Sequence, residues 1–102
     1  MLITKRKPVG VGEILMKEFM EPLGLTQTRL AQAMGLPRKH VNELCRDRRA
    51  VTADTALMLS RVFGNSTDFW LNTQRRVEIW EALNSPSRRE RIRRAKPLRR
   101  AA

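Results

Sequence analysis

The chain has 102 residues and a formal net charge of +11, with 21 lysines and arginines against 10 aspartates and glutamates, which fits one small basic domain with tails. Its aromatic content of 5%, with no tyrosine, argues against a large β-sandwich or barrel and favours a small helical domain. The longest apolar run, Ala56 to Leu59, is too short to span a membrane, and no secretion signal is expected. The single cysteine, Cys45, favours a reducing, cytoplasmic location.

Residues 1–10 are predicted to form a basic N-terminal arm, because Lys5, Arg6 and Lys7 precede Pro8 and apolar side chains do not recur there at helical spacing. This arm either reaches a minor groove or is a disordered start of the chain. A first helix is predicted from Glu13 to Met20, since its apolar side chains recur near one helical face.

Two short helices are predicted to meet at Gly35, a residue suited to a turn with positive φ. Thr26 is a good N-cap for the helix from Gln27 to Met34. The next helix is predicted from about Pro37 to Arg46, with Pro37 in its first position. The side chains expected to fill the shared core are Leu30, Ala31, Met34, Leu36, Val41 and Leu44. This combination is typical of a helix-turn-helix, which places its second helix in the major groove of DNA.

Two further capped helices are predicted before the basic end of the chain. Thr52 can cap a fourth helix that ends before Gly64, and Ser66 or Thr67 can cap a fifth that runs to about Leu83. Pro86 marks the end of the fifth helix. Residues 85–102 hold eight basic residues and one acid, and we expect this Arg-rich tail to be solvated, flexible and largely unfolded alone. The fold class predicted is all-α, with five helices in a DNA-binding and dimerisation domain over residues 11–84.

The candidate DNA contacts divide into those that read bases and those that hold phosphates. The outer side of the third helix carries the candidate base readers, which are Arg38, Lys39, His40, Asn42 and Glu43. Candidate phosphate contacts lie at the start of the second helix, Gln27 and Thr28, and beyond the third helix, Arg46, Arg48 and Arg49. The alternative for Arg38, Lys39 and Asn42 is a solvated helix face with no specific partner.

Other residues favour structural roles over chemical ones. His40 has no second ligand at metal-binding spacing, so no metal and no other cofactor are expected. Cys45 is expected to be an inert packing residue. Val77 and Trp80 suggest that the outer half of the fifth helix meets an apolar partner, which in a homodimer is a second copy. No nucleophile, base and acid are placed together, so no catalytic residues and no enzyme activity are expected.

The helix-turn-helix resembles the Xre or lambda-repressor-like class, and the wider chain resembles the HigA-type antitoxins, also known as virulence-associated protein I. The resemblance covers roughly Pro8 to Leu83. Its most specific pieces are Pro8 to Leu15, Glu18 to Thr26, and the run Asp68-Phe69-Trp70-Leu71-Asn72-Thr73-Gln74. The resemblance implies a dimer that represses its own operon at an inverted-repeat operator in double-stranded DNA. It also implies neutralisation of a RelE-like ribonuclease toxin by complex formation.

Two features depart from that family. Pro37 stands where related recognition helices more often begin with Ser, Thr or His, so base readout is expected to begin at Arg38. Toxins of this group are usually basic, and the tail, with a net charge of +7 over residues 85–102, would repel them. We expect the tail to serve nucleic acid or to have no specific role. A freestanding Xre-like transcriptional repressor without a toxin partner remains the alternative.

Overall fold

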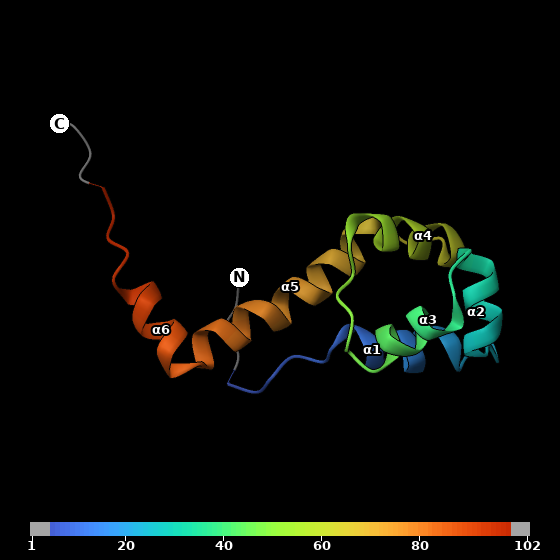
Figure 1. The fold of residues 1–102 in the computed structure, drawn as a ribbon, viewed down its shortest axis with the longest axis horizontal. Coiled ribbons are helices and arrows are strands. Elements are labelled where there is room, and N and C mark those ends of the chain that lie inside the picture. Colours follow the sequence, from blue (N-terminus) through green and yellow to red (C-terminus); the bar gives the residue numbers. More distant parts are fainter. Residues whose placement is uncertain (1–4, 99–102) are drawn as a thin grey trace.

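The structure is a computed structural model that describes residues 5–98 of the chain, and every regular element within that range is helical. The elements follow one another as α1 (Val11–Ile14), η1 (Leu15–Met20), α2 (Gln27–Met34), α3 (Arg38–Cys45), α4 (Ala53–Phe63), α5 (Thr67–Asn84) and α6 (Pro86–Arg93). Figure 1 shows α1 to α4 gathered around the first part of α5, whose second part extends away and carries α6 at its far end. The all-α prediction is confirmed.

Side-chain caps fix the starts of three helices where the sequence predicts them. The hydroxyl of Thr26 accepts a hydrogen bond from the backbone N–H of Arg29, and the hydroxyl of Thr52 accepts one from Thr55. Ser66, rather than Thr67, caps α5 through the N–H of Phe69. Each cap satisfies an amide that the first helical turn leaves unpaired, which is why these boundaries are legible in the sequence.

The turn between α2 and α3 has the geometry that Gly35 permits. Gly35 has φ of +73°, and the next N–H, of Leu36, donates to the carbonyl oxygen of Ala31 at 2.9 Å. A residue with a side chain would be strained at this φ, so glycine allows α2 to end here without backbone strain and directs the chain toward α3.

The core lies where α1, η1, α2, α3, α4 and the first part of α5 meet. Its largest fully buried side chains are Trp70, Leu15, Leu30, Leu44, Leu59 and Val41. The indole N–H of Trp70 donates to Asn65 Oδ1 at 3.0 Å, and the ring packs against Phe19, with centroids 4.8 Å apart. The predicted inward residues of α2 and α3 are buried, apart from Leu36, which is half-buried. The side chains of Met20 and Cys45 touch sulfur to sulfur at 3.8 Å, which confirms Cys45 as a packing residue.

Several predicted boundaries need correction. The first helix begins at Val11, two residues before the predicted Glu13, and its second part, η1, is a π-helix. The third helix begins at Arg38, because Pro37 has extended backbone angles and serves as the N-cap. The prediction of an unfolded tail is wrong for Pro86–Arg93, which form α6, so the helices of residues 5–98 number six when α1 and η1 are taken as one. Pro86 therefore starts α6 as well as following the end of α5.

Candidate nucleic-acid interface

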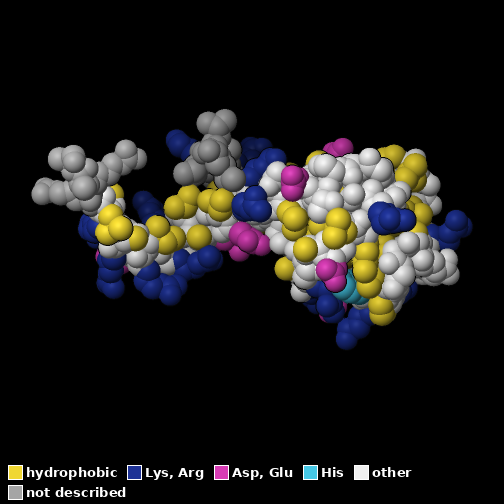
Figure 2. All heavy atoms as spheres, turned by 90° about the horizontal axis from the view of Figure 1, so that it is seen from above, with side chains coloured by type: hydrophobic (Ala, Val, Ile, Leu, Met, Phe, Trp, Pro, Cys, Tyr) yellow, Lys and Arg dark blue, Asp and Glu magenta, His cyan; other side chains and the backbone are white. Residues whose placement is uncertain are grey.

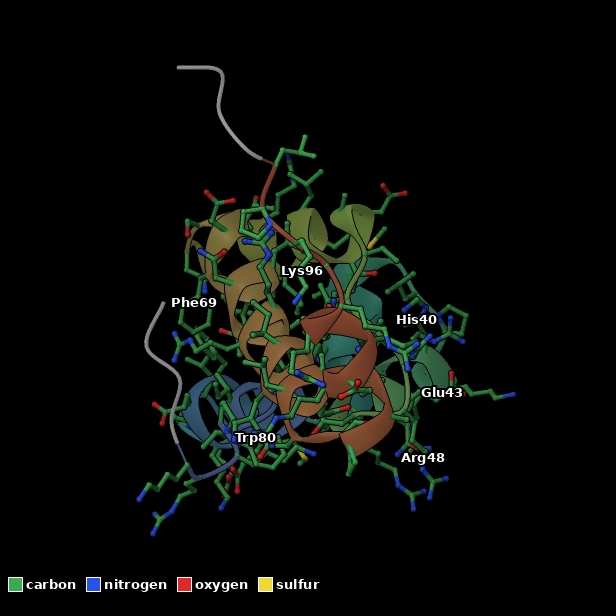
Figure 3. All side chains as sticks on the ribbon, turned by 90° about the vertical axis from the view of Figure 1, so that its left-hand side faces the viewer. His40, Glu43, Arg48, Phe69, Trp80 and Lys96 are labelled. Atoms are coloured by element: carbon green, nitrogen blue, oxygen red, sulfur yellow. The ribbon has the colours of Figure 1, made fainter. Side chains whose placement is uncertain are left out.

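Helix α3 presents one buried side and one polar side. Val41 and Leu44 are buried against the core, whereas Arg38 and Lys39 are exposed. Figure 3 shows His40 and Glu43 from α3, and Arg48 just beyond it, projecting on the same side of the molecule. This surface brings together basic side chains at the start and just beyond the end of one short helix, the arrangement that a groove-reading helix requires.

Asn42 and Gln27 join α3 to the start of α2. The side-chain amide of Asn42 donates to Gln27 Oε1 at 3.0 Å, and both side chains are half-buried. This bond uses one of the two Nδ2 hydrogens of Asn42, which leaves the other hydrogen and the carbonyl oxygen for a partner. Those two groups are what asparagine uses to pair with adenine. The Nε2 hydrogens of Gln27 remain suited to a phosphate, so a candidate phosphate contact holds a candidate base reader in place.

Glu43 is engaged by Arg49 rather than free. Arg49 donates to Glu43 Oε1 through Nε at 3.0 Å and through Nη2 at 2.7 Å. The hydrogen bonds and positive charge of Arg49 hold the pKa of Glu43 below its ordinary value, so the carboxylate is ionised at neutral pH. The pair spans from α3 to the segment that follows it. A base or phosphate that approached either side chain would compete with this bond.

His40 lies at the edge of the same surface and is neutral. Its Nε2 atom is enclosed and has no hydrogen-bond partner among the described residues. Burial is the main cause that lowers the pKa of His40, and the nearby Arg49 lowers it further, while Glu43 acts in the opposite direction. The histidine therefore adds no charge to the surface at neutral pH, and the ring contributes shape.

The basic segment after α3 is held in place by the fifth helix. Arg46 and Arg48 are exposed, and so is Thr28 at the start of α2. The side-chain amide of Gln74, on α5, donates to the backbone oxygen of Val51 at 2.9 Å and also accepts the N–H of Val51. This pair of hydrogen bonds to the backbone fixes the far end of the segment, so its cations have a defined position relative to α3.

Asp47 is a positioning residue that the sequence reasoning missed. It has φ of +55°, and its Oδ1 accepts the backbone N–H of Gly12 at 2.8 Å. Asp47 thereby caps α1 from a distant part of the chain and joins it to the end of α3. Aspartate tolerates positive φ better than most residues, so its place just after the predicted helix was the available signal.

The predicted dimer residues lie on the extended part of α5. Val77 and Trp80 are both half-buried within the chain. Val77 lines a groove of about 700 Å³ between the arm, the segment after α3 and α5. The described part of the arm, residues 5–10, borders this groove, and Lys7 Nζ lies 3.5 Å from Glu81 Oε1 on α5. Val77 shares this groove with Arg48 and Arg49 of the segment after α3.

Charge dominates the exterior around these elements. Figure 2 shows lysine and arginine side chains on several sides of the molecule, and its lower edge carries them both beside the single histidine and at the α6 end. Among residues 5–98, no group of three His, Cys, Asp or Glu side chains is placed to hold a metal ion. Within the same range, no helix is long and apolar enough to cross a membrane.

Comparison with known proteins identifies a matching family model and similar relatives. The helix-turn-helix family model matches residues 16–70, more than half of the chain. The chain is 46% identical over 81 residues to Antitoxin HigA-1 of Vibrio cholerae serotype O1, covering 79% of this chain and 76% of that protein.

Solved structures agree with this likeness. The antitoxin GraA in complex with its operator matches with a TM-score of 0.83 at 33% identity, covering 98% of this chain and 100% of that one. The Pseudomonas aeruginosa antitoxin HigA with the higBA promoter matches with a TM-score of 0.79 at 32% identity, covering 89% and 98%. The fold is therefore of the lambda-repressor-like helix-turn-helix kind.

Proposed function

Because this chain belongs to the helix-turn-helix family, and within it to the HigA-type antitoxins, we propose that it binds operator DNA, represses its own operon and neutralises a toxin. The observation that carries the proposal is the polar side of α3, where exposed Arg38 and Lys39 stand beside an Asn42 held by Gln27. Two relatives of the same fold have been solved with an operator or a promoter.

In the proposed complex, α3 enters the major groove. Arg38 and Lys39 donate to guanine, Asn42 pairs with adenine, and Glu43 accepts from cytosine once Arg49 releases it. His40 contacts the edge of the groove as a neutral ring. The phosphates on either side are held by Gln27, Thr28, Arg46, Arg48 and Arg49. Binding at a promoter excludes polymerase, and affinity falls steeply with salt because each neutralised phosphate releases counterions.

The proposed active form is a homodimer that uses Val77 and Trp80 on α5. Two copies related by a twofold axis place their α3 helices in successive major grooves, about 34–36 Å apart, on an inverted repeat. The half-buried state of both side chains leaves apolar surface on the extended part of α5 for a second copy. The protein acts in the cytoplasm, where its DNA is.

The proposed toxin is a small RelE-like ribonuclease encoded beside this gene. The supporting observation is the 46% identity to a protein named as an antitoxin. The run from Phe69 to Gln74 adds to it, because it resembles the signature that this family carries on its fifth helix. A freestanding repressor without a toxin is the second candidate, and the eight basic residues in 85–102 favour it because they would repel a basic toxin.

The test is to express the neighbouring small reading frame in a host, with and without this chain, and then to purify the two products together. Growth arrest that this chain relieves, with a stable complex recovered, is the expected result. A host that grows normally with the reading frame alone, and no complex, would refute the antitoxin proposal and leave the freestanding repressor. A variant with Arg38→Ala and Asn42→Ala serves as a control, because it should lose operator binding but still relieve toxicity.

A further inference from the structure

Helix α6 is a strongly basic surface to which the proposed function gives no role. Between Arg88 and Lys96 the chain carries six lysines and arginines and one acid, Glu90. Every described residue from Pro86 onward is exposed, and α6 buries none of its side chains. A surface of this kind has no part in the core, so its charge is available to a partner.

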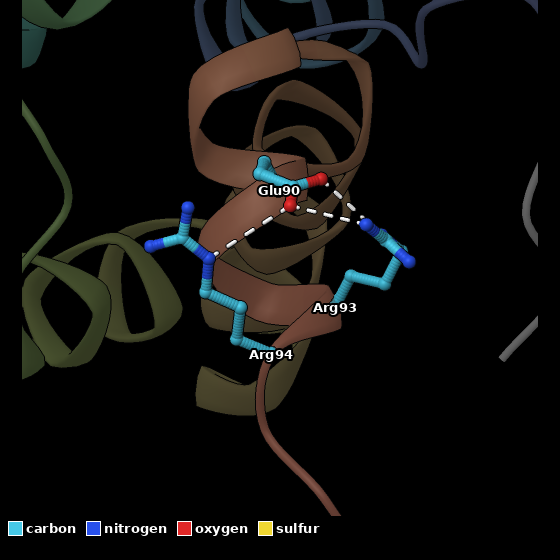
Figure 4. A network of polar contacts seen from close by, with 3 residues as sticks. All are labelled: Glu90, Arg93 and Arg94. Atoms are coloured by element: carbon cyan, nitrogen blue, oxygen red, sulfur yellow. Dashed lines mark hydrogen bonds and ion pairs between the residues drawn. The ribbon is translucent and has the colours of Figure 1, made fainter.

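Internal ion pairs account for only part of that charge. Glu90 Oε1 lies 3.1 Å from Arg93 Nη2 and 3.8 Å from Arg94 Nε, as Figure 4 shows. These pairs lie three and four residues apart, which is the spacing that supports a helix. Arg88, Arg89 and Arg91 form no ion pair within the described part of the chain. One carboxylate therefore offsets part of the positive charge of α6, while three of its arginines have no acidic partner among the described residues.

The position of α6 relates it to the α3 surface. Figure 1 places α6 at the opposite end of the molecule from α2, and the longest dimension of the chain is 56 Å. In Figure 3, α6 is displaced from α5 toward the side on which His40, Glu43 and Arg48 project. Figure 2 agrees, because basic side chains at the α6 end and beside the histidine line the same edge. One side of the molecule thus carries two basic regions. The longest dimension of the molecule, 56 Å, exceeds the length of one helical turn of B-DNA, about 34 Å.

The composition of α6 selects among anionic partners. Helices that lie on membranes need a broad apolar face, whereas the sizeable apolar side chains of this segment are Ile92 and Leu98 alone. Arginine binds phosphate through two parallel hydrogen bonds, and duplex DNA offers phosphates in regular rows. The alignment of α6 with the α3 side favours the duplex that α3 would already hold.

We propose that α6 is a second DNA-contacting element, which binds backbone phosphates of the same duplex away from the bases that α3 reads. The inference rests on the proposed operator binding and extends it. Arg88, Arg89 and Arg91 supply the contacts. Because phosphates are the same in every sequence, α6 adds affinity and salt dependence without adding base preference.

The test compares two triple variants of the full chain. In the first, Arg88, Arg89 and Arg91 are each changed to Gln, which keeps a similar helix propensity and removes three positive charges. In the matched control, exposed arginines of α4 and α5 are changed to Gln, namely Arg61, Arg75 and Arg76. The probes are a duplex selected from a randomised pool by the wild-type chain and a scrambled duplex of equal length. Dissociation constants are measured over a series of salt concentrations, and circular dichroism checks that each variant folds.

The α6 variant should bind the selected duplex about tenfold or more weakly, and its salt slope should fall by about 0.9 for each phosphate that is no longer neutralised. Its preference for the selected over the scrambled duplex should match wild type, and the control should keep the wild-type slope. An α6 variant with the wild-type slope would overturn the inference, as would equal weakening in both triple variants. A wild-type chain that selects no sequence at all would instead refute the proposed operator binding.

Discussion

Gly12 allows α1 to pack directly on the end of α3, and replacing it with alanine should destabilise the protein. An added Cβ at Gly12 would lie 2.3 Å from the carbonyl oxygen of Cys45, 2.7 Å from its carbonyl carbon and 2.8 Å from the oxygen of Leu44. These are backbone atoms of α3, so they cannot rotate away as a side chain would. Helix α1 must therefore move outward in the Gly12→Ala variant.

The size of the effect follows from what that movement breaks. Forcing a methyl group into a packed site costs about 1–3 kcal/mol. Moving α1 also stretches the 2.8 Å bond from the Gly12 N–H to Asp47. A hydrogen bond to a charged group contributes about 1.5–3 kcal/mol. Alanine regains about 1 kcal/mol through its higher helix propensity. The free energy of unfolding should therefore fall by about 1.5–5 kcal/mol, which lowers the melting temperature by at least about 6 °C.

Urea and thermal unfolding followed by circular dichroism measure this change, with Gly10→Ala as the control. A Cβ at Gly10 would meet the carboxylate of Asp47 at 2.8 Å, so that side chain must shift and its bond to the Gly12 N–H weakens, but no backbone atom of α3 stands in the way. The control should therefore lose less stability than Gly12→Ala. If Gly12→Ala stayed within about 0.5 kcal/mol of wild type, the usual range for neutral surface changes, the close packing of α1 on α3 would be refuted.

Three further predictions concern the α3 surface. Gln27 holds Asn42 through a hydrogen bond, so Gln27→Ala and Asn42→Ala should each weaken duplex binding by amounts that do not add in the double variant. A double-mutant cycle should give a coupling energy of about 0.5 kcal/mol or more, and additive losses would contradict the contact. Burial lowers the pKa of His40 below 6.5, so the unfolded chain binds more protons at this residue than the folded chain does. The free energy of unfolding should therefore fall as pH drops through 6.5 toward the pKa of His40 in the folded state. His40→Gln should remove that part of the pH dependence in urea titrations, and an unchanged profile would count against it. Arg38→Ala should relax base preference whereas Arg48→Ala should weaken all duplexes alike, and identical behaviour in binding assays would show that the division of contacts is wrong.

The helix-turn-helix could be predicted from sequence because its determinants are local. Thr26 and Thr52 cap the helices that follow them, and Gly35 takes the positive φ that its turn requires. The buried residues of α2 and α3 recur at helical spacing. Each of these signals lies within a few residues of the feature it controls, so no knowledge of distant contacts was needed.

The features missed depend on contacts between distant residues or on charge. The start of α1 at Val11 involves Asp47, which lies 35 residues after Gly12, so no local pattern marks it. The pairing of Glu43 with Arg49 requires the chain to fold back after α3, which the sequence does not specify. The helix of α6 was missed because it has no apolar face, although Pro86 at its first turn and the spacing of Glu90 to Arg93 were available signals.

The central claim is that α3 reads bases in the major groove in two copies on one operator. Protection of guanine N7 from methylation, mapped on a duplex selected by the wild-type chain, tests it most directly because N7 lies in that groove. Two protected patches about one helical turn apart and related by a twofold axis are expected, with protection reduced by Arg38→Ala. Protection confined to one patch, or protection that Arg38→Ala leaves unchanged, would contradict it.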